Sequence, residues 1–241
     1  GFSRISANSM DAVADRDFVA EFISCASIMM MHVSRLAEEL ILWSSTEFGF
    51  ITIGDGFTTG SSLMPQKRNP DVAELARGKT GRVYGHLIAI LTTLKALPLT
   101  YNRDLQEDKV YLFDTVDTVK STLTICTDMI ASVRLMPERM KDSIQDYVLA
   151  TDIADYLVRR GVPFREAHGI SARVSAYARA EGRTLADLTL AEYQRFSARF
   201  EDDILGLTVE QSVAARTVTG GTAPSHVADA LKEARRSLNL E

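Results

Sequence analysis

The chain begins with a long segment in which apolar residues recur at spacings of three and four. Between Asp17 and Ser44 these positions are Phe18, Phe22, Ile23, Ala26, Met30, Val33, Leu36, Leu40 and Trp43. Such spacing gathers apolar side chains on one face of an α-helix. The pattern therefore predicts a long buried helix over this segment.

Two further long helices are predicted downstream. Pro70 and Asp71 open one that continues to about Leu97, because proline is tolerated in a first helical turn and an acidic residue suits the helix dipole there. Another runs over about 105–134, and its apolar stripe is Val110, Leu112, Phe113, Val116, Val119, Leu123, Cys126, Met129 and Ile130. Helices of this length pack naturally into an extended antiparallel bundle, and such bundles usually associate.

The predicted elements become shorter after Pro137. Helices are expected near 138–148, 151–160, 164–182, 190–199, 208–216 and 225–239, separated by glycine and proline. We place a domain boundary near Pro137, which gives a helical-bundle domain over 1–137 and a small helical domain over 138–241. No stretch alternates in the manner of a strand, so the predicted fold class is all-α.

Composition narrows the class of partner. The net charge of -5 leaves no basic stripe for a phosphate backbone, so a small molecule is a better partner than nucleic acid. No apolar run reaches transmembrane length, and the start of the sequence has no signal-peptide pattern, so no membrane partner is expected. Cys25 and Cys126 lie in apolar helical stretches and are interpreted as reduced core residues of a cytoplasmic protein.

The sequence contains no residue pattern typical of a metal or cofactor site. The histidines are isolated, without a partner at metal-ligand spacing: His32, His86, His168 and His226. Each is expected to be structural, and the sequence indicates no metal, nucleotide or flavin.

The richest candidate chemistry lies on a polar, glycine-rich stretch over 49–70, which is expected to be a mobile loop. It ends in Gly60-Ser61-Ser62-Leu63-Met64-Pro65-Gln66-Lys67-Arg68-Asn69-Pro70. This segment places hydroxyls, a cation and an amide directly before a helix amino terminus, which can bind an anion such as a carboxylate. The alternative is a surface linker on which Lys67 and Arg68 are merely solvated.

These residues carry a resemblance. GSSLMPQKRNP is similar to the signature GSSxMPxKxNP of the fumarase/aspartase superfamily, and matches all eight of its specified positions. Other segments resemble the argininosuccinate lyase family: SMDAVADRDF, STEFGF, LARGKTGRV, LPLTYNRDLQEDK, YLVRRGVPFREAH and SVAARTVTGGTAPS. The resemblance covers essentially the whole chain. It implies the carboxy-terminal half of a cytoplasmic, homotetrameric lyase that needs no cofactor and splits argininosuccinate into arginine and fumarate, in arginine biosynthesis or the urea cycle.

The resemblance assigns roles to the loop. The proton removed from the substrate lies beside a carboxylate, so its loss creates a doubly charged aci-carboxylate that needs nearby cations and donors. Lys67 and Asn69 are expected to supply them. Ser61 matches the family's general base, which requires loop closure and donors that stabilise the alkoxide. Two alternatives remain open: Ser62 is the reactive hydroxyl, or Ser61 caps the turn.

Further positions match the family outside the loop. Glu74 matches a carboxylate that pairs with a catalytic histidine; the alternative is a first-turn acid that only stabilises its helix. Tyr101, Gln106 and Lys109 match substrate-binding positions, together with Asn69; the alternative is that they are solvated residues at a helix start. Four residues lie in another family-like stretch where chemistry alone assigns no role: Asn8, Ser9, Asp11 and Arg16.

The superfamily builds each active site from three separated regions on different subunits, and the histidine-bearing region normally precedes the segment at which this chain begins. The chain is therefore expected to be inactive alone and to expose apolar helix faces unless a partner covers them. Competing interpretations are an adenylosuccinate lyase-like sister enzyme, against which Gln66 and YNRDLQEDK argue, a structural protein of the delta-crystallin type, and a bare oligomerisation bundle in which Ser61→Ala would change nothing.

Overall fold

The structure is a computed structural model that describes residues 4–60, 63–64, 67–144 and 146–240. The chain divides into two compact units, residues 1–143 and 144–241. The boundary predicted near Pro137 coincides with the first residue of helix α5 (Pro137–Asp142), which lies in the first unit.

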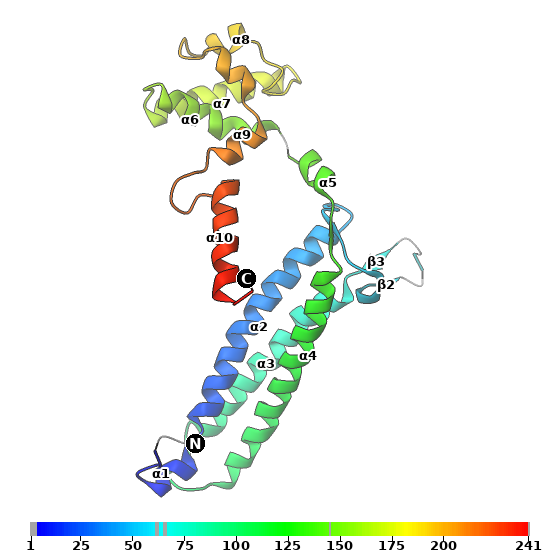
Figure 1. Cartoon of the computed structure of the whole chain (residues 1–241), viewed down its shortest axis with the longest axis vertical. Helices are drawn as coiled ribbons and strands as arrows, with labels where there is room; N and C mark the ends of the chain where they lie inside the picture. Colours follow the sequence, from blue (N-terminus) through cyan, green and yellow to red (C-terminus); the bar gives the residue numbers. More distant parts are fainter. Residues whose placement is uncertain (1–3, 61–62, 65–66, 145, 241) are drawn as a thin grey trace. The chain divides into compact units, whose positions relative to one another are not determined.

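Three long helices form the first unit (Figure 1). They are α2 (Asp17–Ser44), α3 (Asp71–Leu94) and α4 (Asp108–Ala131). Helix α3 packs against both α2 and α4, and the short helix α1 (Ser9–Ala14) precedes α2. The three predicted long helices are confirmed, although α3 ends and α4 begins about one turn inside the predicted limits, because the segment between them forms the 3-10 turn η2 (Arg103–Glu107).

The buried side of α2 is narrower than its apolar stripe. Ile23, Met30 and Leu40 are buried as predicted, and the Thr80 hydroxyl of α3 donates to the Met30 carbonyl oxygen at 3.1 Å. Four stripe residues are exposed instead: Phe18, Phe22, Leu36 and Trp43. Only one side of α2 faces its two neighbours in this unit, so a wide stripe cannot be covered by them alone.

Helix α4 departs further from its prediction. Its buried face carries Thr115, Thr118 and Thr122, whereas Val110 and Phe113 of the predicted stripe point to solvent. The Thr122 hydroxyl donates to the Thr118 carbonyl oxygen at 2.7 Å, which satisfies it inside the bundle. Val119, Cys126 and Met129 of the predicted stripe are buried as expected. The periodicity identified the helix correctly, but the buried face combines these residues with the threonines.

Two expectations from composition are corrected. Cys126 is buried, but Cys25 is exposed, so only one of the two free cysteines is a core residue. Helix α2 is long and apolar enough, by length and composition, to cross a membrane, with a mean hydropathy of 1.2 over its most apolar window. Core helices of bundles pass the same test, and α2 packs along α3 and α4.

Short strands that were not predicted lie within the segment between α2 and α3, and one more follows α4. Strand β1 (Ile51–Thr52) pairs antiparallel with β4 (Arg134–Leu135), and β2 (Thr59–Gly60) pairs antiparallel with β3 (Arg68–Asn69). The 3-10 turn η1 (Asp55–Phe57) lies between β1 and β2. Two-residue strands leave no alternating pattern to detect. Parts of the expected loop, near both of its ends, are therefore regular structure.

The second unit is a cluster of shorter helices. These are α6 (Ala150–Arg159), α7 (Phe164–Ala180), α8 (Leu190–Gln194), α9 (Val209–Ala214) and α10 (Pro224–Ser237), with 3-10 turns η3 (Asp146–Leu149) and η4 (Asp202–Gly206). Its core includes Ile153, Leu157, Val174 and Phe200. The all-α class is confirmed.

Candidate functional site

The described part of the signature loop forms a small hairpin in front of α3. In the β2-β3 pair, Thr59 lies opposite Asn69 and Gly60 opposite Arg68. The Thr59 hydroxyl also donates to the carboxylate of Asp71, the first residue of α3. Both ends of the hairpin are thereby tied together, and Asn69 is held immediately before the helix amino terminus.

Two predicted site residues flank Asn69. Lys67 lies two residues before it and is exposed, and Glu74 lies on the first turn of α3 and is also exposed. In the described part of the chain neither side chain takes part in an ion pair, so both charges are available to a ligand. Ser61, the proposed base, lies outside the described residues, as do Ser62 and Gln66.

Charge around this hairpin is mixed. The Arg68 guanidinium lies 3.3 Å from an Asp55 carboxylate oxygen, and both side chains are largely exposed. Asp71 and Glu74 place two carboxylates on the first turn of α3. Since Asp55 offsets Arg68, Lys67 is the cation that this group can offer to an anionic ligand.

The second predicted group surrounds η2 and the first turn of α4. Tyr101 is 47% exposed, Gln106 is exposed, and the Lys109 ammonium lies 3.1 Å from Asp108 Oδ1. The backbone here is anchored to α1, because the Thr100 N–H donates to the Met10 carbonyl oxygen at 3.3 Å. These three residues therefore lie on an anchored segment and are exposed to solvent.

An ion pair that the sequence did not suggest supports this second group. Arg16 Nε lies 2.5 Å from Asp108 Oδ2, and the Asp108 side chain is only 8% exposed. Burial raises the pKa of Asp108, but hydrogen bonds from Arg16 and Lys109 outweigh it and hold that pKa below its usual value. The pair joins the start of α2 to the start of α4, across 92 positions of sequence. Each residue stands in a family-like stretch, but nothing in either stretch shows that they meet.

The two groups lie at opposite ends of α3 (Figure 1). Asn69 precedes the helix and Tyr101 follows it, and α3 has 24 residues. At 1.5 Å per residue that length separates them by about 36 Å. One copy of the chain thus cannot bring both groups to one small ligand, and a site that uses both needs more than one copy.

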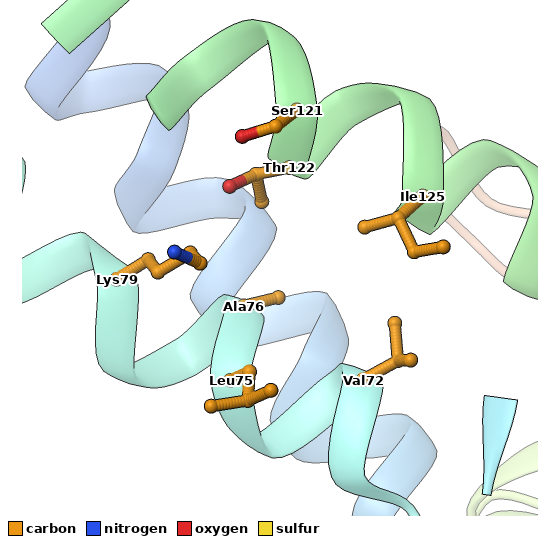
Figure 2. Close-up of a pocket in the computed structure, with 7 residues that line it drawn as sticks. All are labelled: Val72, Leu75, Ala76, Lys79, Ser121, Thr122 and Ile125. Atoms are coloured by element: carbon orange, nitrogen blue, oxygen red, sulfur yellow. The ribbon is translucent and has the colours of Figure 1, made fainter. Parts of the chain in front are cut away.

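A hollow between α3 and α4 takes in neither group. Its volume is about 290 Å³, and Figure 2 shows its lining: Val72, Leu75, Ala76, Lys79, Ser121, Thr122 and Ile125. The lining is mostly apolar, with the Lys79 amine as its charged group. This hollow lies on the side of the bundle and is not the candidate site.

Two of the four histidines have a polar neighbour within hydrogen-bond distance. His86 Nδ1 lies 3.0 Å from the Thr115 hydroxyl, and His226 Nδ1 lies 3.2 Å from the Gly221 carbonyl oxygen. Within residues 4–60, 63–64, 67–144 and 146–240, no three His, Cys, Asp or Glu side chains gather as metal ligands would.

Comparison with known proteins decides the family. A family model described as "Lyase" matches residues 1–85, and one described as "Argininosuccinate lyase C-terminal" matches residues 147–214. An argininosuccinate lyase of Moorella thermoacetica is 57% identical over 240 residues, which are 99% of this chain and 52% of that protein. The chain belongs to the argininosuccinate lyase family. A second family member, from Dehalococcoides mccartyi, is 54% identical over 239 residues with the same coverage of both chains.

Solved structures agree with the family and with the all-α fold. An EDDS lyase variant with bound fumarate superposes with a TM-score of 0.81 at 29% identity, over 99% of this chain and 50% of that one. The chain spans about half the length of the curated relatives it matches. The resemblance inferred from the signature loop is therefore confirmed.

Proposed function

We propose that this chain is the carboxy-terminal half of an argininosuccinate lyase, which splits argininosuccinate into arginine and fumarate. The observation that carries the proposal is the hairpin that presents the exposed Lys67 and the partly exposed Asn69 at the amino terminus of α3. The named relatives support the substrate, and an EDDS lyase of the same fold is described with bound fumarate.

The proposed chemistry follows from what each group can offer. Ser61 removes the proton beside the substrate carboxylate, and Lys67 and Asn69 stabilise the aci-carboxylate that results. Glu74, one turn into α3, orients a histidine supplied by the region that precedes this segment in the relatives. No resident cofactor takes part.

Substrate binding is assigned to the other end of the bundle. Lys109 pairs with a substrate carboxylate, while Tyr101 and Gln106 bind the guanidinium-bearing arm. Because α3 separates these residues from Asn69 by about 36 Å, each complete site combines the Lys67 group of one copy with the Lys109 group of another.

The outward faces of the bundle support such an assembly. Large apolar side chains are exposed on all three long helices: Phe18, Ile28, Leu75, Ile88, Leu91, Val110 and Phe113. Apolar exposure on this scale marks an interaction surface. We infer that copies of the chain cover these faces in a homotetramer, located in the cytoplasm and serving arginine biosynthesis or the urea cycle.

The experiment uses an extended protein, defined here as this chain joined to the amino-terminal portion of the M. thermoacetica relative. Fumarate release is measured with argininosuccinate, adenylosuccinate, malate and aspartate, for the extended protein and for the chain alone. Release from argininosuccinate only, and only by the extended protein, is the expected result.

Each other outcome contradicts a defined part of the proposal. Release from adenylosuccinate alone identifies the sister enzyme. If the extended protein folds as a helical oligomer but acts on none of the four substrates, a structural protein of the delta-crystallin type becomes the preferred interpretation. Activity of the chain alone refutes the assignment of an acid-base partner outside it.

A further inference from the structure

The signature loop begins with a stem, residues 51–57, and this stem contacts the end of α4. No role has yet been assigned to the contact. The Gly54 N–H donates to the Ser132 hydroxyl oxygen at 3.1 Å, and Ser132 directly follows α4. The same hydroxyl donates to the Met129 carbonyl oxygen at 2.6 Å. Its proton is thus directed into the helix end, which leaves a lone pair aimed at Gly54.

The contact requires glycine for a steric reason. A Cβ atom at position 54 would lie 2.9 Å from Ser132 Cβ and 3.0 Å from its Oγ. Gly54 has a φ of -57°, which any residue can adopt. Backbone strain is therefore not what selects glycine here; the close approach of Ser132 is.

A continuous set of contacts leads from this point to the candidate site. Strands β1 and β4 pair immediately beside it, with Thr52 opposite Arg134. On the other side, η1 places Phe57 against the core, and the next strand sets Thr59 opposite Asn69. Strand β2 pairs with β3 on one side, and the η1 turn connects it to Gly54 on the other.

An open, polar cavity of about 480 Å³ borders the contact, and it is lined by Thr52, Ile53, Gly54, Asp55, Ala131, Ser132, Val133 and Arg134. On the amino-terminal side of Gly54, the β1–β4 pairing and the buried Ile51 and Ile53 hold the stem. Between Ile53 and β2, the Gly54–Ser132 hydrogen bond and close approach join the stem to the end of α4 beside this cavity.

We propose that Gly54 and Ser132 form a latch that positions the signature loop, with Ser132 as a positioning residue outside that loop. Its effect on turnover rests on the proposed function; its effect on the loop does not. Opening the latch lets β2 shift relative to Asn69, which lowers the fraction of molecules in which the loop has its productive geometry.

The test is a double-mutant cycle in the extended protein. Ser132→Gly removes the hydrogen bond, and kcat is expected to fall about 2- to 10-fold, the range set by the net value of one hydrogen bond. Gly54→Ala introduces the clash and should reduce kcat more, by at least about 10-fold. In the double variant Ser132 no longer blocks the new Cβ, so kcat should return to the level of Ser132→Gly alone.

Ser143→Ala is the matched control. Ser143 also follows a helix, α5, and its hydroxyl donates to the Met140 carbonyl oxygen at 2.7 Å, as Ser132 does to Met129. It accepts no hydrogen bond from the signature loop in the described residues. Its kcat and KM should equal those of the unchanged protein, while the latch variants should change kcat much more than KM.

A second readout needs no turnover. Lys67 and Arg68 are exposed tryptic sites in the loop, so limited trypsinolysis followed by mass spectrometry reports its accessibility. Gly54→Ala should speed cleavage there several-fold, whereas Ser143→Ala should not. The latch is refuted if Gly54→Ala leaves both kcat and cleavage unchanged, or if the double variant loses the product of the two single losses. If no version releases fumarate but cleavage follows the expected order, the proposed function fails and the latch stands.

Discussion

The two units of the chain differ in how their buried apolar side chains are grouped. In the second unit Ile153, Leu157, Val174 and Phe200 are fully buried and form one closed core. In the first unit the buried apolar residues form three smaller clusters, and Phe113 on the outer face of α4 is 60% exposed. The second unit is organised around one core, whereas the long helices of the first leave large apolar side chains exposed.

Buried and exposed apolar side chains affect different properties of the protein, namely its stability and its assembly. A closed core stabilises a unit through the area that it removes from water, so truncating a core side chain costs free energy of unfolding. An exposed apolar face contributes little until a partner covers it, and then it contributes to association. The same type of substitution should therefore have different consequences in the two units.

The largest expected effect is on the core of the second unit. Phe200 is fully buried and its ring contacts those of Tyr156 and Tyr193, at 5.8 and 5.1 Å between centroids. Phe200→Ala should lower the free energy of unfolding by about 3–5 kcal/mol. Urea unfolding followed by circular dichroism measures it, with Phe113→Ala as the comparison at an exposed site. Equal losses for the two variants would remove the distinction between the units.

The next effect is on assembly. Phe113→Asp places a carboxylate on the outward face of α4, where an apolar partner surface would have to bury it. Association should weaken by more than about tenfold, a change of about 1.4 kcal/mol, while helical content stays the same. Sedimentation velocity over a concentration series measures it. Ala176→Asp, at an exposed position of α7 in the second unit, is the control; an unchanged assembly in both variants would show that the face of α4 is not an interface.

The units also differ in how far the sequence predicted them. Spacings of three and four identified the long helices, because amphipathic periodicity is a property of each segment alone. The same spacing could not tell which face of α4 meets α3, because an apolar stripe covered by a partner has the same period as one covered by the core. Phe113 and Thr115 show the result: the apolar residue is exposed and the threonine is buried.

The candidate site shows a similar division. Lys67 and Asn69 were predicted from the signature motif, and Lys109 was predicted from the resemblance to the family. The contacts that support them were not, because they join distant parts of the chain: Arg16 meets Asp108 across 92 positions, and Gly54 meets Ser132 across 78. The packing of the helices brings Arg16 to Asp108, and the pairing of β1 with β4 brings Gly54 to Ser132.

A smaller effect tests the polar edge of the second unit. The Asp152 side chain is only 7% exposed and lies 2.6 Å from the Arg216 guanidinium, and the Ser212 hydroxyl also donates to it. Arg216→Ala should cost about 1–3 kcal/mol, because a buried carboxylate loses its cation but keeps one donor. Lys232→Ala is the control, since Lys232 and Asp229 are both mostly exposed at 3.7 Å, and it should cost almost nothing. Thermal unfolding of the two variants measures the difference, and equal midpoints would contradict it.

The smallest effect is a pH dependence confined to the second unit. A hydrogen bond from Arg183, then those from the backbone and hydroxyl of Thr189, lower the pKa of Glu192 from its usual 4.5 to about 2. A carboxylate whose pKa is depressed on folding stabilises the native state above its unfolded pKa, and this contribution is lost as pH falls toward the folded value. The urea midpoint of the second unit should therefore decline between about pH 5 and pH 2. Glu192→Gln should flatten that decline, whereas Glu233→Gln, on the exposed helix α10, should leave its slope unchanged. Parallel slopes for Glu192→Gln and the unchanged protein would mean that this capping carboxylate does not link the fold of the second unit to pH.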